Sequence, residues 1–109
     1  MKMYIFIKDS IPDNFAPLVA AHASLSCYLA FKKDAGMIEW QKTSFKKVIC
    51  RVSDSDFAWL KLWGITNNFD INVTTESALD SVQVAITYCP QKELPDFFKD
   101  FTLWNTKDS

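Results

Sequence analysis

The segment Met3–Ile7 (MYIFI) constrains the fold most, because it is a continuous run of apolar, β-forming side chains. A run of this length and composition is typical of a strand that is buried on both of its faces. Such a strand needs other elements packed above and below it, and the rest of the chain supplies segments with helical periodicity. The sequence therefore predicts a sheet that is covered by helices on two sides.

Further strands and helices alternate along the chain. The predicted strands are Met3–Ile7, Lys47–Val52, Asp70–Val73 and Val82–Tyr88, and the predicted helices span about 14–33, 37–42, 54–67 and 94–100. Ser53 or Asp54 is the expected cap of the third helix, since both residue types accept hydrogen bonds from the first turn. Leu103 and Trp104 are expected only to pack against the core after the last helix.

The order of these elements predicts the fold class. Alternating strands and helices favour a largely parallel sheet. The last two strands are joined by eight residues, TTESALDS (74–81), without a helix, so they are expected to run antiparallel. We therefore predict an α/β fold with three layers, α/β/α, around a four-stranded mixed sheet. The 109 residues suffice for one hydrophobic core and not for two, which predicts a single domain over 1–109.

The charge balance argues against strong, non-specific binding to nucleic acid. The chain has 12 Lys and Arg against 13 Asp and Glu, and a formal net charge of −1. A protein that binds many phosphates usually carries a clear basic excess. The lysines at 32–33 and 42–47 are interpreted as solvated side chains at helix ends and in a loop.

The sequence shows no motif for a metal or a cofactor, so we predict neither. Cys27, Cys50 and Cys89 are widely spaced and form no CxxC motif, and buried reduced thiols are therefore expected. A single histidine among scattered carboxylates is no zinc signature, and two isolated glycines form no phosphate-binding loop. The first apolar run is too short for a signal peptide or a membrane span, which favours a cytoplasmic protein without a membrane partner.

His22 is the only histidine and lies in PLVAAHASLSCYLAF (17–31), a segment of small and apolar residues. The small side chains allow a helix to approach a sheet closely. Two interpretations of the imidazole stay open at this point. It is either a core group that is satisfied by a carbonyl or a hydroxyl, or a base, because an imidazole changes its charge near neutral pH.

Four stretches of the chain carry a resemblance to a known family. They are FIKD (6–9), AAHA (20–23), KKVICRVSDSD (46–56) and VQVAITYCPQKELPDFFKDFTLWN (82–105). In this order and spacing the chain resembles the type II peptidyl-tRNA hydrolase family over almost its whole length. The tail and the short loop before it are more similar to the eukaryotic peptidyl-tRNA hydrolase domain-containing relatives. The resemblance implies the family's fold and hydrolysis of the ester between a peptide and tRNA.

The resemblance also implies where an active site would lie. His22 and Asp9 stand where the family has its histidine and an aspartate. Glu76 is a candidate to replace a second family aspartate, or else a solvated loop residue. Phe15 and Val19 occupy the positions of the family's lysine and glutamine, and the stretch TTESALDS lacks the family's glycine and Thr-Gln.

On this interpretation His22 is the base, and Asp9 or Glu76 orients it. Ser26 lies one helical turn after His22 and is expected to contact the imidazole or the substrate, and Thr75 is a further candidate for substrate contact. Loss of one oxyanion donor typically lowers a rate about a hundred- to a thousandfold. The missing lysine and glutamine therefore imply weak activity unless other groups supply donors.

Two other functions stay open beside hydrolysis of peptidyl-tRNA. With an eroded site, the same fold would bind a protein or an RNA end, or a second copy of itself as a homodimer. Phe15 and Val19 would then form an apolar rim, which suits protein contact. A third reading is an enzyme that acts on a small molecule, since one fold supports many reactions.

Overall fold

The computed structural model describes residues 1–105 and has a mixed α/β fold. Its strands are β1 (Lys2–Lys8), β2 (Lys46–Val52), β3 (Ile71–Glu76), β4 (Val82–Tyr88) and β5 (Thr102–Leu103). Its α-helices are α1 (Ala16–Phe31), α2 (Ala35–Lys42) and α3 (Asp54–Thr66), and its short 3₁₀ turns are η1 (Asp13–Phe15), η2 (Ser77–Leu79) and η3 (Asp96–Asp100). All four predicted strands are present, β4 with the predicted bounds and the other three with shifted ends, and so are the first three predicted helices.

The sheet has the order β3-β4-β1-β2-β5 and is mixed, as predicted. The predicted parallel majority is wrong, because only β1 and β2 run parallel, while the other three neighbouring pairs are antiparallel. The reason is the path of the chain after β3. A short turn reverses it into β4, and β4 inserts beside β1 at the centre of the sheet instead of extending one edge.

The count of four strands is also corrected, because the structure has a fifth. Thr102 and Leu103 pair with Arg51 and Cys50 of β2, and the Trp104 N–H donates to the Ile49 carbonyl at 2.9 Å. The predicted helix over 94–100 is only the 3₁₀ turn η3, which starts directly after Pro95. Elements of two to five residues have no periodicity by which a sequence could reveal them.

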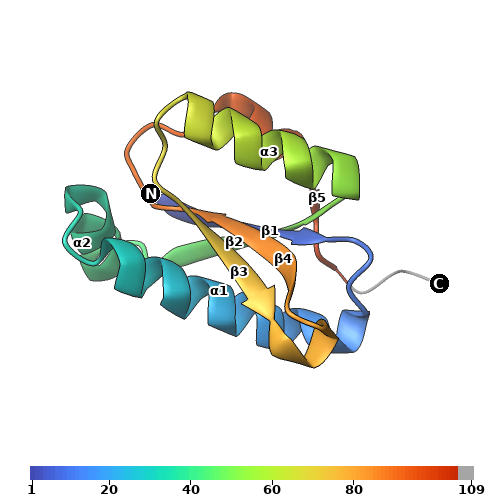
Figure 1. Ribbon diagram of the computed structural model, residues 1–109. Helices are drawn as coiled ribbons and strands as arrows, with labels where there is room; N and C mark the ends of the chain where they lie inside the picture. Colours follow the sequence, from blue (N-terminus) through green and yellow to red (C-terminus); the bar gives the residue numbers. More distant parts are fainter. Residues whose placement is uncertain (106–109) are drawn as a thin grey trace.

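Helices cover both faces of the sheet, so the predicted layering is observed (Figure 1). In β1, Met3, Ile5 and Ile7 pack in the core under α1 and α2, and Tyr4 and Phe6 pack in the core under α3 and η3. All five side chains are buried, which confirms the expected two-sided burial of this strand. The alternation follows from the strand's period of two residues.

An aromatic cluster fills the core beneath α3. Phe98 of η3 is fully buried and contacts the rings of Tyr4, Phe6 and Tyr88 at centroid distances of 4.8 to 5.2 Å. The Tyr88 hydroxyl donates to the Leu60 carbonyl of α3 at 2.7 Å. This buried hydrogen bond fixes the helix against the sheet.

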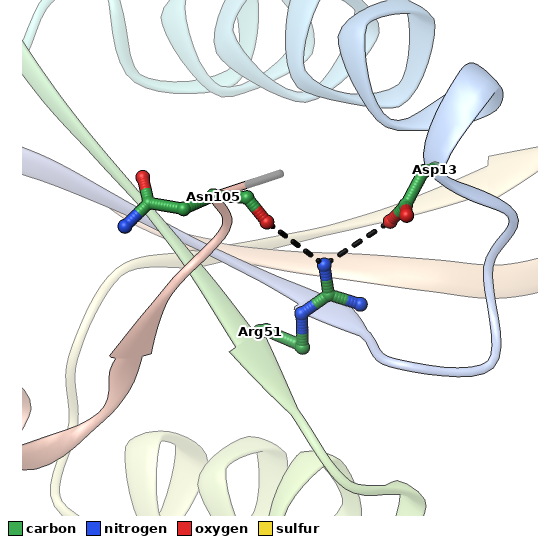
Figure 2. Close-up of polar contacts among 3 residues, drawn as sticks. All are labelled: Asp13, Arg51 and Asn105. Carbon is green, nitrogen blue, oxygen red and sulfur yellow. Dashed lines mark hydrogen bonds and ion pairs between the residues drawn. The ribbon is translucent and has the colours of Figure 1, made fainter. Parts of the chain in front are cut away.

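Arg51 of β2 contacts η1, the turn before α1, and Asn105, the last described residue (Figure 2). Its Nη2 donates to Asp13 Oδ1 at 3.1 Å and to the Asn105 carbonyl at 3.3 Å. The guanidinium carbon also lies 3.8 Å from the centre of the Trp104 ring. The guanidinium of Arg51 thereby links β2 to η1 and to the segment that follows β5.

Within residues 1–105, no helix is both long and apolar enough to cross a bilayer. Cys27, Cys50 and Cys89 are free thiols and are buried.

Candidate functional site

His22 and Glu76 face each other at one edge of the sheet. His22 lies on α1, Glu76 is the last residue of β3, and His22 Nε2 is 3.7 Å from Glu76 Oε2. The histidine side chain is 53% exposed and the glutamate side chain only 7%. The imidazole therefore reaches solvent while its carboxylate partner is held inside the protein.

The local structure of β3 explains why Glu76 is buried. The strand continues to residue 76, beyond the predicted end at Val73, because it pairs with β4 over this whole length. Thr74 and Glu76 are buried and Thr75 between them is exposed, as alternation in a strand requires. Glu76 Oε1 accepts the Ala78 N–H at 3.1 Å, which anchors the carboxylate at the start of η2.

A surface groove of about 510 Å³ contains both groups. Its apolar wall is formed by Leu25, Leu29 and Val73, and its hydroxyl-bearing side chains are Ser26, Thr75, Ser77 and Ser81. Among the described residues 1–105, no Lys or Arg side chain lines the groove. It is therefore a mixed apolar and hydroxyl-bearing surface around a histidine–carboxylate pair, without a cation for phosphate.

The turn at one end of the groove has an unusual backbone. Asp80 and Ser81 both have φ of 58°, in the left-handed region that L side chains rarely adopt. The Ser81 N–H donates to the Glu76 carbonyl at 2.9 Å, which closes the turn on the residue that carries the carboxylate. Backbone strain of this kind is often found at functional sites.

The structure brings four of the seven predicted site residues together and keeps three apart. His22, Glu76, Ser26 and Thr75 all line the groove, and Asp9, Phe15 and Val19 do not.

Each of the three outlying residues has a different position. Asp9 is exposed after β1, where its N–H donates to the Val52 carbonyl at 2.7 Å. Val19 is completely buried in the core, and Phe15 packs partly buried against that core. Val19 is therefore not part of an exposed rim.

A second group of polar side chains was not predicted from the sequence. Ligand atoms of Asp34, Asp70 and Cys89 all lie within 4.8 Å of one another. The pKa of Asp70 is raised to about 6. The largest cause is a hydrogen bond with the Asp34 carboxyl, and burial and the negative charge of Asp34 contribute less. The three residues are far apart in the sequence. The one feature of the sequence that could have indicated their proximity is that Asp70 and Cys89 flank two strands predicted to pair.

The fold and the groove define an α/β domain with an exposed histidine and a buried carboxylate at the edge of a mixed sheet. Comparison of the sequence with protein-family models and with curated proteins finds no match.

Proposed function

We propose that this chain is an ester hydrolase of the peptidyl-tRNA hydrolase type, with His22 as its general base. The contact between His22 and Glu76 supports the proposal, because an accessible imidazole beside a buried carboxylate is a common arrangement for proton transfer. The substrate class rests on the resemblance of the sequence to that family. An ester linking a peptide to the terminal ribose of tRNA is the bond to be broken.

The reaction proposed for this pair needs one water molecule. Glu76 lies on the Nε2 side of the ring, which leaves Nδ1 as the nitrogen that takes a proton from water. The hydroxide attacks the ester carbonyl carbon, and the tetrahedral intermediate breaks its bond to the ribose oxygen. That oxygen takes the proton from the imidazolium as it leaves. The Glu76 carboxylate stabilises the positive ring between these two steps.

Donors for the oxyanion would come from hydroxyl groups in the same groove. Ser26 lies on α1 with His22, and Ser77 and Ser81 line the groove near Glu76. Neutral hydroxyls would here replace the lysine and glutamine that the family resemblance leads one to expect. Because no Lys or Arg of residues 1–105 lines the groove, we expect a slow enzyme that binds the RNA portion of its substrate weakly.

The proposal places the protein in the cytoplasm. Its three thiols are buried and free, as they are in proteins of reducing compartments.

Release of peptide from peptidyl-tRNA by purified protein tests the proposal. We expect activity that His22→Asn lowers by about a hundredfold or more, in line with the usual contribution of a general base. Glu76→Gln should also slow the reaction, because it removes the charge that faces the ring. Asp9→Asn is the matched control and should leave the rate unchanged, since Asp9 lies outside the groove. Absence of peptide release, or an unaffected His22→Asn variant, would refute the proposal.

One observation favours a second candidate function, a module that binds a protein or a second copy of the chain. Leu25 and Leu29 are 58% and 57% exposed and lie four residues apart, so they share one face of α1. Sedimentation velocity over a range of concentrations tests the homodimer. A mass that rises with concentration in wild type and not in Leu25→Glu would support it, and a constant monomer would exclude it.

A further inference from the structure

The second polar cluster lies at the opposite end of α1 from the strained turn, where three segments meet. Asp34 precedes α2, Asp70 precedes β3 and Cys89 follows β4. The Cys89 N–H donates to the Asp70 carbonyl at 2.9 Å, so the β3–β4 ladder itself places these two residues opposite each other. Asp34 lies in the turn between α1 and α2, which places it beside Asp70 and Cys89.

The thiol of Cys89 is directed toward a carboxylate in a sheltered position. Cys89 is only 6% exposed, and its Sγ lies 3.8 Å from Asp34 Oδ2. Its other acceptor is the carbonyl of the adjacent Pro90, also at 3.8 Å. A small cleft of about 260 Å³ opens beside these groups.

Residues 1–105 place no positive side chain beside the two carboxylates. The ion pairs found within residues 1–105 are His22–Glu76 and Arg51–Asp13, and no Lys, Arg or His lines this cleft. Two carboxyl groups in contact without a cation repel each other when both are ionised. The pKa of Asp70 is raised chiefly by a hydrogen bond with the Asp34 carboxyl, then by burial, and then by this repulsion.

A glycine makes the approach of these segments possible. A Cβ atom at Gly36, in the first turn of α2, would lie 2.1 Å from the Pro90 carbonyl oxygen. Any larger residue at position 36 would therefore push the segment after β4 away from α2. Gly36 thus allows Cys89 and Asp34 to come together, and the site is shaped by the packing of backbone as well as by its side chains.

We infer that Asp34, Asp70 and Cys89 form a binding site for a divalent cation of the zinc class. One thiolate and two carboxylates within reach of a single ion are a donor set that zinc accepts, and a sulfur ligand disfavours magnesium and calcium. Three protein ligands leave a fourth position for water or another ligand. On binding, the ion replaces the proton of the Cys89 thiol, and this proton passes to the solvent.

This inference does not depend on the hydrolase proposal, since the two sites have no residue in common. It differs from the prediction, based on sequence spacing, that the protein binds no metal. Residues 34, 70 and 89 form no short motif and meet only through the β3–β4 pairing and the turn after α1.

Titration of the metal-free protein with Co²⁺, followed by competition with Zn²⁺, tests the site. We expect an absorption band from charge transfer between the Cys89 thiolate and cobalt, which Zn²⁺ removes and Mg²⁺ or Ca²⁺ does not. A cation held at His22 and Glu76 would give no such band, because that groove contains no thiol. Cys89→Ser should abolish the band, and Cys50→Ser is the matched control, since Cys50 is buried in the other core.

Asp70→Asn keeps the test decisive if Cys89→Ser does not fold, because the Asp70 side chain is exposed and its replacement leaves the cores intact. Loss of a residue that only hydrogen-bonds to a metal ligand typically lowers metal affinity about ten- to a hundredfold. Loss of the Asp70 ligand itself should therefore weaken Co²⁺ binding at least about tenfold. The inference is overturned if wild type shows no thiolate band, if the band persists in folded Cys89→Ser, or if Asp70→Asn binds Co²⁺ as wild type does.

Discussion

The Glu76 carboxylate makes two different contacts, one with His22 and one with the backbone of Ala78. One carboxylate oxygen of Glu76 lies 3.7 Å from His22 Nε2, and the other accepts the Ala78 N–H at 3.1 Å. The same side chain therefore caps the turn after β3 and faces the imidazole. A substitution at position 76 affects both the local fold and the charge beside His22, and the two effects are separable.

Two variants at position 76 separate these effects by their stability. Glu76→Gln retains an oxygen that can accept the Ala78 N–H, so its free energy of unfolding should match wild type within about 0.5 kcal/mol. Glu76→Ala loses the cap and should cost about 1 kcal/mol. Urea denaturation measures both. Equal loss of stability in the two variants would show that the charge of Glu76 matters to the fold more than its hydrogen bond.

Ser81→Gly should stabilise the protein. Ser81 has φ of 58°, a conformation that costs an L residue about 1–2 kcal/mol and glycine almost nothing. The greater freedom of glycine in the unfolded chain offsets part of this gain, which leaves about 0.5–1 kcal/mol. Ser77→Gly is the control, because Ser77 lies in η2 without a positive φ and should be destabilised instead. A lower denaturation midpoint for Ser81→Gly would contradict the strain assigned to this turn.

Gly64→Ala should destabilise the packing of α3 on the sheet by about 1–3 kcal/mol, as overpacking usually does. A Cβ atom at this position would lie 2.4 Å from the Tyr88 hydroxyl and 3.0 Å from Ile71 Cγ2. Tyr88→Phe removes the hydroxyl, so the double variant should recover part of the loss. A double-mutant cycle measures this coupling. Strict additivity of the two substitutions would argue against a steric conflict between Gly64 and Tyr88.

Arg51→Lys should be almost as damaging as Arg51→Ala, at about 1–2 kcal/mol. A lysine carries the charge but lacks the planar group that bonds Asp13 and Asn105 (Figure 2) and that also lies on the Trp104 ring. Thermal unfolding measures the stability of both variants. If Arg51→Lys is as stable as wild type, the charge alone accounts for the contribution of this residue.

Metal-free protein should lose stability as the pH rises from about 4 to about 6, through the titration of Asp70. The Asp34 carboxyl raises the pKa of Asp70 from 3.8 to about 6 in the folded state, so the folded protein holds this proton more tightly than the unfolded chain. This contribution is fully present below pH 3.8 and is lost as the pH passes 6. Denaturation in the presence of a chelator should show the decline in wild type and a smaller one in Asp70→Asn. Asp80→Asn is the matched control.

The sequence was sufficient for features that depend on neighbouring residues. The apolar run Met3–Ile7 predicts a strand buried on both faces, and every one of its side chains is buried. Ser53 was an expected cap of the third helix, and its hydroxyl accepts the Asp56 N–H at 3.1 Å. Strand period, helix period and caps act over a few residues, so they can be recognised without knowledge of the fold.

Only the tertiary structure decided which segments meet. It placed β4 between β3 and β1, extended β3 to Glu76, and added β5 along β2. It thereby put Glu76, and not Asp9, beside His22, and it assembled Asp34, Asp70 and Cys89 at the far end of α1. Such contacts join residues far apart in the chain. They depend on the order and direction of strands, which the packing of the whole core selects and no local pattern encodes.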